Sequence, residues 1–201
     1  NIPVVNFNLI FDAGFSADQF AAPGTASLTS GVIDEGTKTR TSLQISEELQ
    51  NLGASLGSSA GLDFSTLTLS ALKMNLDKSL EIFTDVLLNP SFPQSDFDRL
   101  KKTQLAQIKQ EKTTPRMIAL RVFPKILFGE GHTYANPFTG SGYEESVEKM
   151  TREDLIKFYN TWYKPNNATL VVVGDITMDE LVPKLEKLLK NWKSAEVPKK
   201  N

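Results

Sequence analysis

The chain contains no cysteine and only one histidine among its 201 residues. Without cysteine, disulfide bonds, thiolate zinc sites and cysteine nucleophiles are excluded. A single histidine does not make a typical zinc site, because protein-bound zinc normally takes several nitrogen or sulfur donors. Basic and acidic residues nearly balance, at 22 and 24, and no dense basic stripe is present, which argues against a nucleic-acid binder. No apolar run approaches the length of a membrane span.

What is present is the composition of an ordinary globular domain, with 40% hydrophobic and 23% charged residues. The length fits a single domain over residues 1–201. The sequence opens at Asn1 without a methionine, so we expect it to be a piece of a longer protein.

Hydrophobic periodicity predicts an α+β fold, with helices packed mainly on one face of a mixed, mostly antiparallel sheet. We expect residues 170–173, a continuous apolar run, to form a central strand covered on both faces. Residues 129–142 are expected to be loop, and Pro124 to kink or reposition its helix. The predicted strands are 4–11, 55–60, 64–72 and 168–174; the predicted helices are 23–36, 41–53, 76–88, 93–112, 114–128, 151–162 and 177–192.

Few polar residues are candidates for catalysis. His132 could act as a general base, but we favour a loop histidine bonded to backbone. A serine nucleophile needs a base and an oxyanion hole, and no Gly-x-Ser-x-Gly elbow surrounds any serine considered. We therefore interpret these serines as small or capping residues: Ser16, Ser27, Ser30 and Ser42.

Three acidic pairs are present, Asp34–Glu35, Glu144–Glu145 and Glu153–Asp154. Adjacent residues on a helix do not face one another, so these are poor general acid–base pairs. We expect them to lie on solvated faces.

Three groups of segments together resemble the pitrilysin, insulinase and mitochondrial processing peptidase family, the inverted zincins. Each segment is modest alone, but their order and spacing cover nearly the whole chain. The first group is 11–15, 23–28 and 34–37; the second is 97–115; the third is 131–134, 140, 144–146, 151–155, 158–159, 163–167 and 170–175.

This resemblance implies a zinc site of the form His-x-x-Glu-His on the helix after the first strand, with a further glutamate from another helix. Two histidines four residues apart share one helix face, and the glutamate between them activates a zinc-bound water. In the matching register, Ser27 and Gly31 stand at the histidine positions, Ser30 at the catalytic glutamate and Gln107 at the third ligand. All four functional groups are therefore missing, so we expect no catalytic residue and no metal or cofactor in this chain.

The resemblance accordingly implies a non-catalytic domain, with the fold of a metallopeptidase domain of the LuxS and mitochondrial processing peptidase type. It implies at least one further similar domain, a zinc-bearing catalytic subunit or half as partner, and an unfolded peptide as substrate. Family domains usually begin with one more strand, so we expect an unpaired sheet edge. The alternatives are a purely structural subunit without a role in proteolysis and, less favoured, an enzyme with different chemistry.

Overall fold

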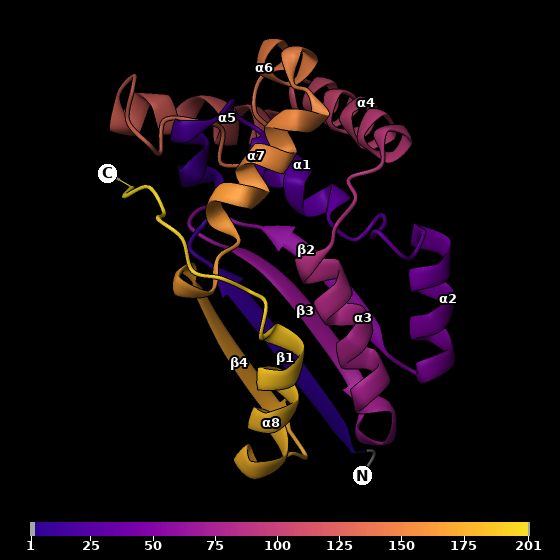
Figure 1. The fold of residues 1–201 in the computed structure, drawn as a ribbon. Coiled ribbons are helices and arrows are strands. Elements are labelled where there is room, and N and C mark those ends of the chain that lie inside the picture. Colours follow the sequence, from indigo (N-terminus) through magenta and orange to yellow (C-terminus); the bar gives the residue numbers. More distant parts are fainter. Residues whose placement is uncertain (1–2, 201) are drawn as a thin grey trace.

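A four-stranded antiparallel sheet forms the base of the molecule (Figure 1). The computed structural model describes residues 3–200, so the start of the chain at Asn1 lies outside the described part. The strand order is β2-β3-β1-β4, and every neighbouring pair is antiparallel. The strands are β1 (Val4–Phe11), β2 (Ser55–Ala60), β3 (Ser65–Leu72) and β4 (Ala168–Gly174).

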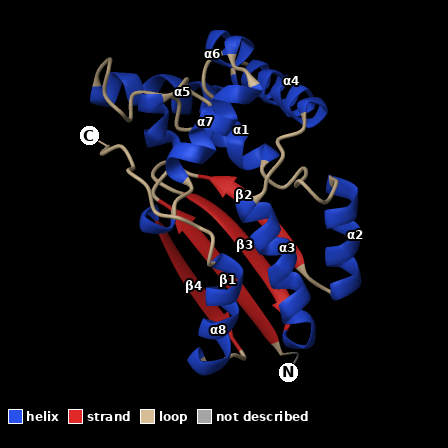
Figure 2. Cartoon of the chain, viewed as in Figure 1, coloured by secondary structure: helices blue, strands red, loops and turns tan. Residues whose placement is uncertain are grey.

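Helices cover one face of this sheet and form a second group beyond one end of it (Figure 2). α3 and α8 lie over the sheet, while α1, α4, α5, α6 and α7 gather beyond its end. The α+β prediction is confirmed. The helices are α1 (Thr25–Val32), α2 (Ser42–Leu52), α3 (Leu76–Leu88), α4 (Gln94–Glu111), α5 (Pro115–Phe128), α6 (Glu144–Lys149), α7 (Arg152–Trp162) and α8 (Met178–Leu189).

The alternation of side chains along β1 decides which face is covered. Phe7 is buried and lies opposite Leu69 on β3 and Val172 on β4. The intervening Asn8 lies opposite Thr68 and Val171 on the other face. Because strand side chains alternate between faces, the sheet has one apolar face under the helices and one open face.

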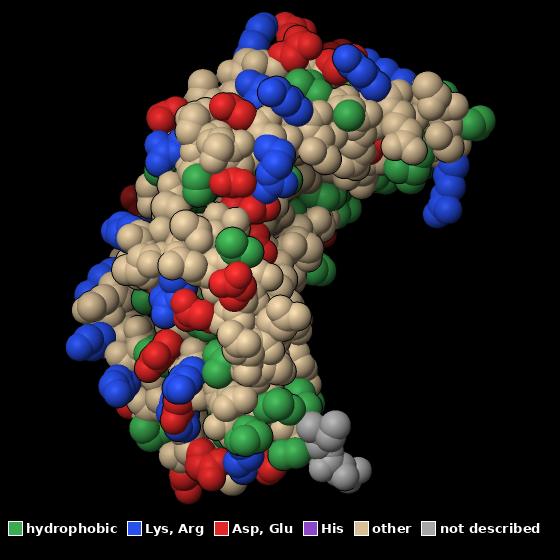
Figure 3. All heavy atoms as spheres, turned by 90° about the vertical axis from the view of Figure 1, so that its right-hand side faces the viewer, with side chains coloured by type: hydrophobic (Ala, Val, Ile, Leu, Met, Phe, Trp, Pro, Cys, Tyr) green, Lys and Arg blue, Asp and Glu red, His purple; other side chains and the backbone are tan. Residues whose placement is uncertain are grey.

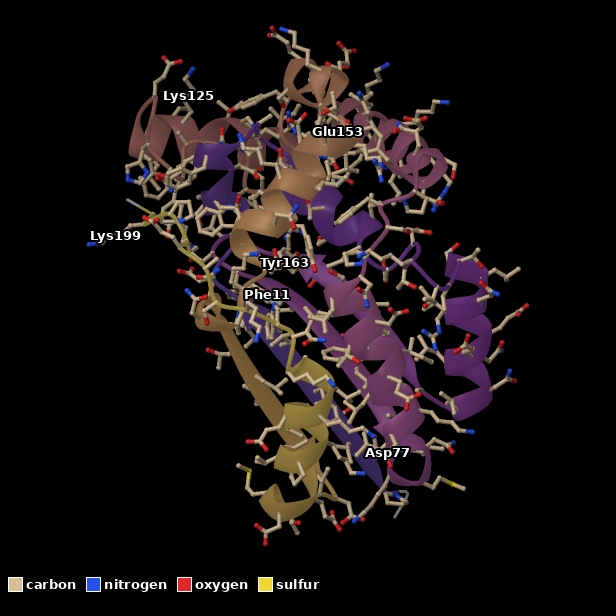
Figure 4. The ribbon with its side chains drawn as sticks, viewed as in Figure 1. Phe11, Asp77, Lys125, Glu153, Tyr163 and Lys199 are labelled. Carbon is tan, nitrogen blue, oxygen red and sulfur yellow. The ribbon has the colours of Figure 1, made fainter. Side chains whose placement is uncertain are left out.

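An aromatic contact joins the sheet to the upper helices. The rings of Phe11, at the end of β1, and Tyr163, directly after α7, have centroids 4.3 Å apart (Figure 4). Trp192, after α8, meets the edge of Phe11 at 6.2 Å. Stacked and edge-to-face rings add to the burial of their apolar area, so this cluster fixes the two layers against each other.

Helix starts follow the capping signals in the sequence. Thr41, Thr151 and Thr177 each accept a hydrogen bond from the backbone three residues on, and each helix has a reciprocal capping box. Pro23, expected in the first turn of a helix, instead precedes α1, which begins at Thr25.

The prediction of a central, doubly covered strand at 170–173 was wrong. β4 is an edge strand, and Val171 and Val173 on its outer face are 44% and 64% exposed. A run of apolar β-branched residues indicates a strand, but it does not indicate how many neighbours that strand has.

Pro124 lies within a continuous helix, α5. Its missing N–H leaves the carbonyl of Leu120 without the usual helical donor. The backbone N–H of Phe138 donates to that carbonyl at 3.0 Å. The expected loop at 129–142 therefore satisfies the helix backbone that proline interrupts. The sequence analysis did not predict the short helix α6 that follows this loop.

Candidate functional site

The helix α1 carries three of the four positions that the family resemblance singled out, and α4 carries the fourth. The two helices pack against each other, and α7 packs against α1 from another side. A buried carboxylate fixes the start of α1, because Asp18 accepts hydrogen bonds from the backbone N–H of Gly24 at 2.7 Å and of Ala26 at 2.9 Å. Burial raises the pKa of Asp18 to about 7, although these backbone donors oppose the shift.

The four positions hold neutral groups or no side chain. Ser27 Oγ donates to the carbonyl of Gly140 at 2.8 Å, and Ser30 Oγ donates to the carbonyl of Ser27 at 3.1 Å. Gly31 is exposed, and an added Cβ would meet no atom within 4 Å. Gln107 is exposed and donates to Glu111 Oε1 at 3.0 Å. The hydroxyls and the amide are thus engaged with neighbouring protein groups.

Sequence reasoning missed the main polar feature beside these positions, a buried ion pair between Glu111 and Arg121. Glu111 Oε2 and Arg121 Nη1 are 2.5 Å apart, and their side chains are 3% and 8% exposed. Ser141 donates to the same carboxylate oxygen at 2.7 Å and Thr139 at 3.2 Å. Arg121 also donates to the carbonyl of Gly142 at 2.8 Å. The pair therefore joins α4, α5 and the loop 139–142.

The spacing of Glu111 and Arg121 in the sequence does not predict this ion pair, because the two residues lie ten positions apart on either side of the break between α4 and α5. α5 contains two arginines, Arg116 and Arg121, and nothing in the sequence distinguishes the buried Arg121 from the exposed Arg116. Burial alone would raise the pKa of Glu111, but hydrogen bonds from Ser141, Gln107 and Arg121 lower it below its usual value. A carboxylate held ionised by this many donors is suited to clamping helices and not to proton transfer.

Two glycines let the loop approach the segment 15–24, which precedes α1, closely. Gly140 has φ 71°, and a Cβ there would lie 2.1 Å from the ring of Phe15. Gly142 has φ 73°, and a Cβ there would lie 2.1 Å from the carbonyl oxygen of Pro23. Any larger residue would push the loop away from Phe15 and Pro23, so we expect the nearby hydrogen bond between Ser27 and Gly140 to depend on both glycines.

The remaining candidates show no catalytic arrangement. His132 is an exposed loop residue whose Nδ1 accepts from the backbone N–H of Tyr134 at 3.0 Å, and its ring stacks on Phe128. This confirms the interpretation as a backbone-bonded loop histidine. Ser16 is buried, and Ser42 is the first residue of α2. Within residues 3–200, no imidazole or carboxylate is hydrogen-bonded to Ser27 or Ser30.

The acidic pairs divide into two groups. Glu144 pairs with Lys112, Glu145 with Lys149 at 2.7 Å, and Asp154 caps α7, as expected for surface carboxylates. The expectation was wrong for Asp34, which is half-buried at the end of α1 and whose pKa is raised to about 6 by that burial. Its neighbour Glu35 pairs with Arg99 at 2.7 Å.

Among the described residues, no group of three or more histidine, cysteine, aspartate or glutamate side chains is placed to hold a metal ion. In the same part of the chain, no helix combines the length and the apolar character that crossing a bilayer requires.

Comparison with known proteins agrees with the resemblance seen in the sequence. Residues 1–138 match the family model described as insulinase (peptidase family M16). The chain belongs to the M16 peptidase family. Residues 149–201 match the model described as the peptidase M16 inactive domain. The expected family is therefore confirmed, and the chain is an inactive-type M16 domain of a zinc protease-like family.

Individual M16 relatives give the same result. The chain is 25% identical to an uncharacterized zinc protease of Rickettsia bellii over 98% of its own length and 48% of the relative's. It is 25% identical to the human mitochondrial-processing peptidase subunit beta over 87% of its length and 35% of that protein's. A crystal structure of a peptidase M16 inactive domain from Pseudomonas fluorescens superposes with a TM-score of 0.92 at 27% identity, covering 100% of this chain and 48% of that one. The chain spans about half the length of the first curated relatives it matches.

The anchor at the start of α1 predicts an unusual pH dependence of stability. Asp18 has a pKa of about 7 in the folded M16 domain and an ordinary value of 3.8 when unfolded. Between these values the folded state binds more protons, so the free energy of unfolding should fall as the pH rises from about 4 to about 7. Asp34, with a pKa of about 6, contributes in the same direction.

Asp18→Asn should reduce this pH dependence of the free energy of unfolding. It should also lower that free energy by about 1–3 kcal/mol, because one buried N–H loses its acceptor. Urea unfolding at several pH values measures this, with exposed Asp179→Asn as control; an unchanged curve for Asp18→Asn would contradict the assignment.

The buried ion pair predicts non-additive substitutions. Arg121→Met leaves the Glu111 carboxylate buried without its cation and should lower the free energy of unfolding by about 3–5 kcal/mol. The double variant Glu111→Met/Arg121→Met removes both charges and should be less destabilised than the sum of the two single variants. Lys149→Met, which removes an exposed ion pair, should cost under about 1 kcal/mol. Denaturant titration of these variants measures the coupling, and additive losses would show that Glu111 and Arg121 do not act as a pair.

Proposed function

We propose that this domain is a non-catalytic wall of a chamber that encloses an unfolded peptide, opposite a catalytic M16 half that carries the zinc. The observation that carries the proposal is the retained α1–α4 scaffold with no ligand at the four positions Ser27, Ser30, Gly31 and Gln107. We assign these as vestigial catalytic positions, because serine, glycine and glutamine replace the ligand and base types that zinc hydrolysis requires.

The open face of the sheet supports contact with a peptide. The side of the molecule seen in profile in Figure 3 is concave where the sheet is not covered by helices. None of the four strands contains a charged residue, and the outward side chains on the central strands include Asn6, Asn8, Thr66 and Thr68. Amides and hydroxyls both donate and accept hydrogen bonds, so this wall tolerates peptides of different sequence.

A purely structural subunit is the second candidate. The buried ion pair between Glu111 and Arg121 supports this candidate, because it stabilises the region beside the vestigial positions through protein groups alone. Such a subunit would associate with a catalytic half without altering its reaction.

Reconstitution separates the two functions. The protein is co-expressed with an M16 half that carries the His-x-x-Glu-His sequence, and hydrolysis of an unfolded peptide is compared with and without it. A chamber wall should raise peptide cleavage by the complex well above that of the catalytic half alone, and zinc chelation should abolish it. Association without any change in cleavage would support the structural subunit. Neither association nor a change in cleavage would overturn both.

Metal analysis tests the vestigial positions. The unmodified protein should retain no stoichiometric zinc after dialysis, because neutral hydroxyl and amide groups are poor zinc ligands. The variant Ser27→His/Ser30→Glu/Gly31→His/Gln107→Glu should retain about one zinc per chain, since two imidazoles and a carboxylate form a catalytic-type ligand set. The open space at Gly31 and the exposure of Gln107 accommodate the new side chains at these two positions.

The triple variant that keeps Gln107 is the matched control and should bind zinc more weakly, because it lacks the ligand from α4. Zinc bound at these positions in the unmodified protein would overturn the non-catalytic assignment. No gain of zinc in the quadruple variant would contradict the register that places Ser27 and Gln107 in one site.

A further inference from the structure

A cavity of about 740 Å³ lies where the end of α1, the helix α2 and the start of β2 meet. Figure 3 views the molecule from the side on which α2 and β2 lie. Asp34 lies at one edge of the cavity, two residues after the end of α1 and three residues after Gly31. The cavity therefore lies just past the end of α1 that carries Gly31, and its lining includes neither the four vestigial positions nor Glu111 and Arg121.

The cavity has an apolar floor. Ile45 and Leu49, one turn apart on α2, are 4% and 7% exposed and contribute to it. Leu56 on β2 completes it from the sheet side. These side chains offer a surface to methylene groups. The hydroxyls of Ser42, Ser46 and Ser55 at the rim carry no charge.

One carboxylate at the edge of the cavity has no cation in the described part of the chain. Glu35 is paired with Arg99 at 2.7 Å, and Arg40 is paired with Glu48 at 3.0 Å and Asp85 at 2.8 Å. Asp34 forms no ion pair among residues 3–200, and its own backbone N–H donates to the carboxylate, which is half-buried. A partly desolvated carboxylate without a cation is unfavourable, and a cation that enters the cavity relieves that cost.

We propose that this cavity binds a lysine or arginine side chain of a peptide, with the charged end at Asp34 and the aliphatic stem over Ile45, Leu49 and Leu56. Long basic side chains bury their methylene stems on apolar surface while the charged end reaches a polar partner. A metal ion does not fit, because Asp34 is the only free carboxylate at the cavity and its other polar neighbours are neutral hydroxyls and an amide.

The inference rests on the proposed peptide-binding role and adds a preference to it. The open sheet face carries no charge and accepts peptides of varied sequence, whereas the cavity selects a basic side chain at one point along the peptide. A free primary amine lacks the stem that would cover the apolar floor, so it should bind more weakly than lysine within a peptide.

The test uses two peptides whose termini are blocked, Ac-Ala-Ala-Lys-Ala-Ala-NH2 and the same peptide with norleucine in place of lysine. Norleucine keeps an aliphatic stem and lacks the ammonium group, so the pair isolates the charge. Methyl resonances of Ile45, Leu49 and Leu56 are followed by NMR during titration of the full chain. We expect saturable shifts with the lysine peptide and affinity about tenfold lower with norleucine, which corresponds to ~1.4 kcal/mol.

Two charge-removing variants complete the test. Asp34→Asn should lower affinity for the lysine peptide about tenfold and leave that for the norleucine peptide unchanged, because it removes a charge-assisted contact. Glu35→Gln is the matched control and should change neither, since its carboxylate already pairs with Arg99. Thermal unfolding of both variants verifies that they fold.

Equal affinity for the two peptides, full lysine affinity in Asp34→Asn, or no shift of the cavity methyl groups with either peptide would each overturn the inference. These results do not depend on the outcome of reconstitution with a catalytic half. Failure of the proposed cavity site can therefore be distinguished from failure of the proposed chamber role.

Discussion

The buried ion pair between Glu111 and Arg121 is the interaction on which the upper half of the molecule depends. It joins the last turn of α4 to the middle of α5 and draws the loop 139–142 onto α1 through Ser141 and Gly142. Each partner is desolvated, so neither charge is stable there without the other. Around it, Gly140 and Gly142 bring the loop backbone against Phe15 and Pro23, just before α1, at distances that exclude a side chain. The packing of the loop beside Ser27 on α1 follows from this clamp.

The same arrangement holds the polar groups around Ser27 and Gln107 in place through contacts within the protein. In a metal site, the metal ion supplies the positive charge that holds carboxylates together. Here Arg121 supplies a permanent positive charge to Glu111, and the amide of Gln107 donates to the same carboxylate. The hydroxyl of Ser27 is likewise satisfied by the carbonyl of Gly140. The side chains of Glu111, Gln107 and Ser27 are therefore paired within the chain, which is consistent with an inactive-type M16 domain.

Charge is distributed unevenly over the surfaces that a peptide would meet. The strands are uncharged, so the open sheet face offers hydrogen-bonding groups without selecting the charge of a ligand. Asp34 stands apart because its neighbours Glu35 and Arg40 are already engaged by Arg99, Glu48 and Asp85. One free carboxylate above an apolar floor gives a local preference to a surface that otherwise has none.

Local sequence determined most of the secondary structure. Alternation identified β1 and β3, threonine caps identified the starts of α2, α7 and α8, and the residue types at 27, 30, 31 and 107 indicated the loss of a zinc site once the family was recognised. These signals are local because hydrogen-bonding caps and side-chain periodicity act within a few residues. Tertiary structure alone decided the rest. The apolar run of β4 became an edge strand, the carbonyl that Pro124 leaves unpaired accepts from the N–H of Phe138, and Asp34 became half-buried beside the cavity at α2 and β2. Glu111 and Arg121 met across a helix break for the same reason: neighbours and burial depend on how distant segments pack, and no spacing along the chain encodes that.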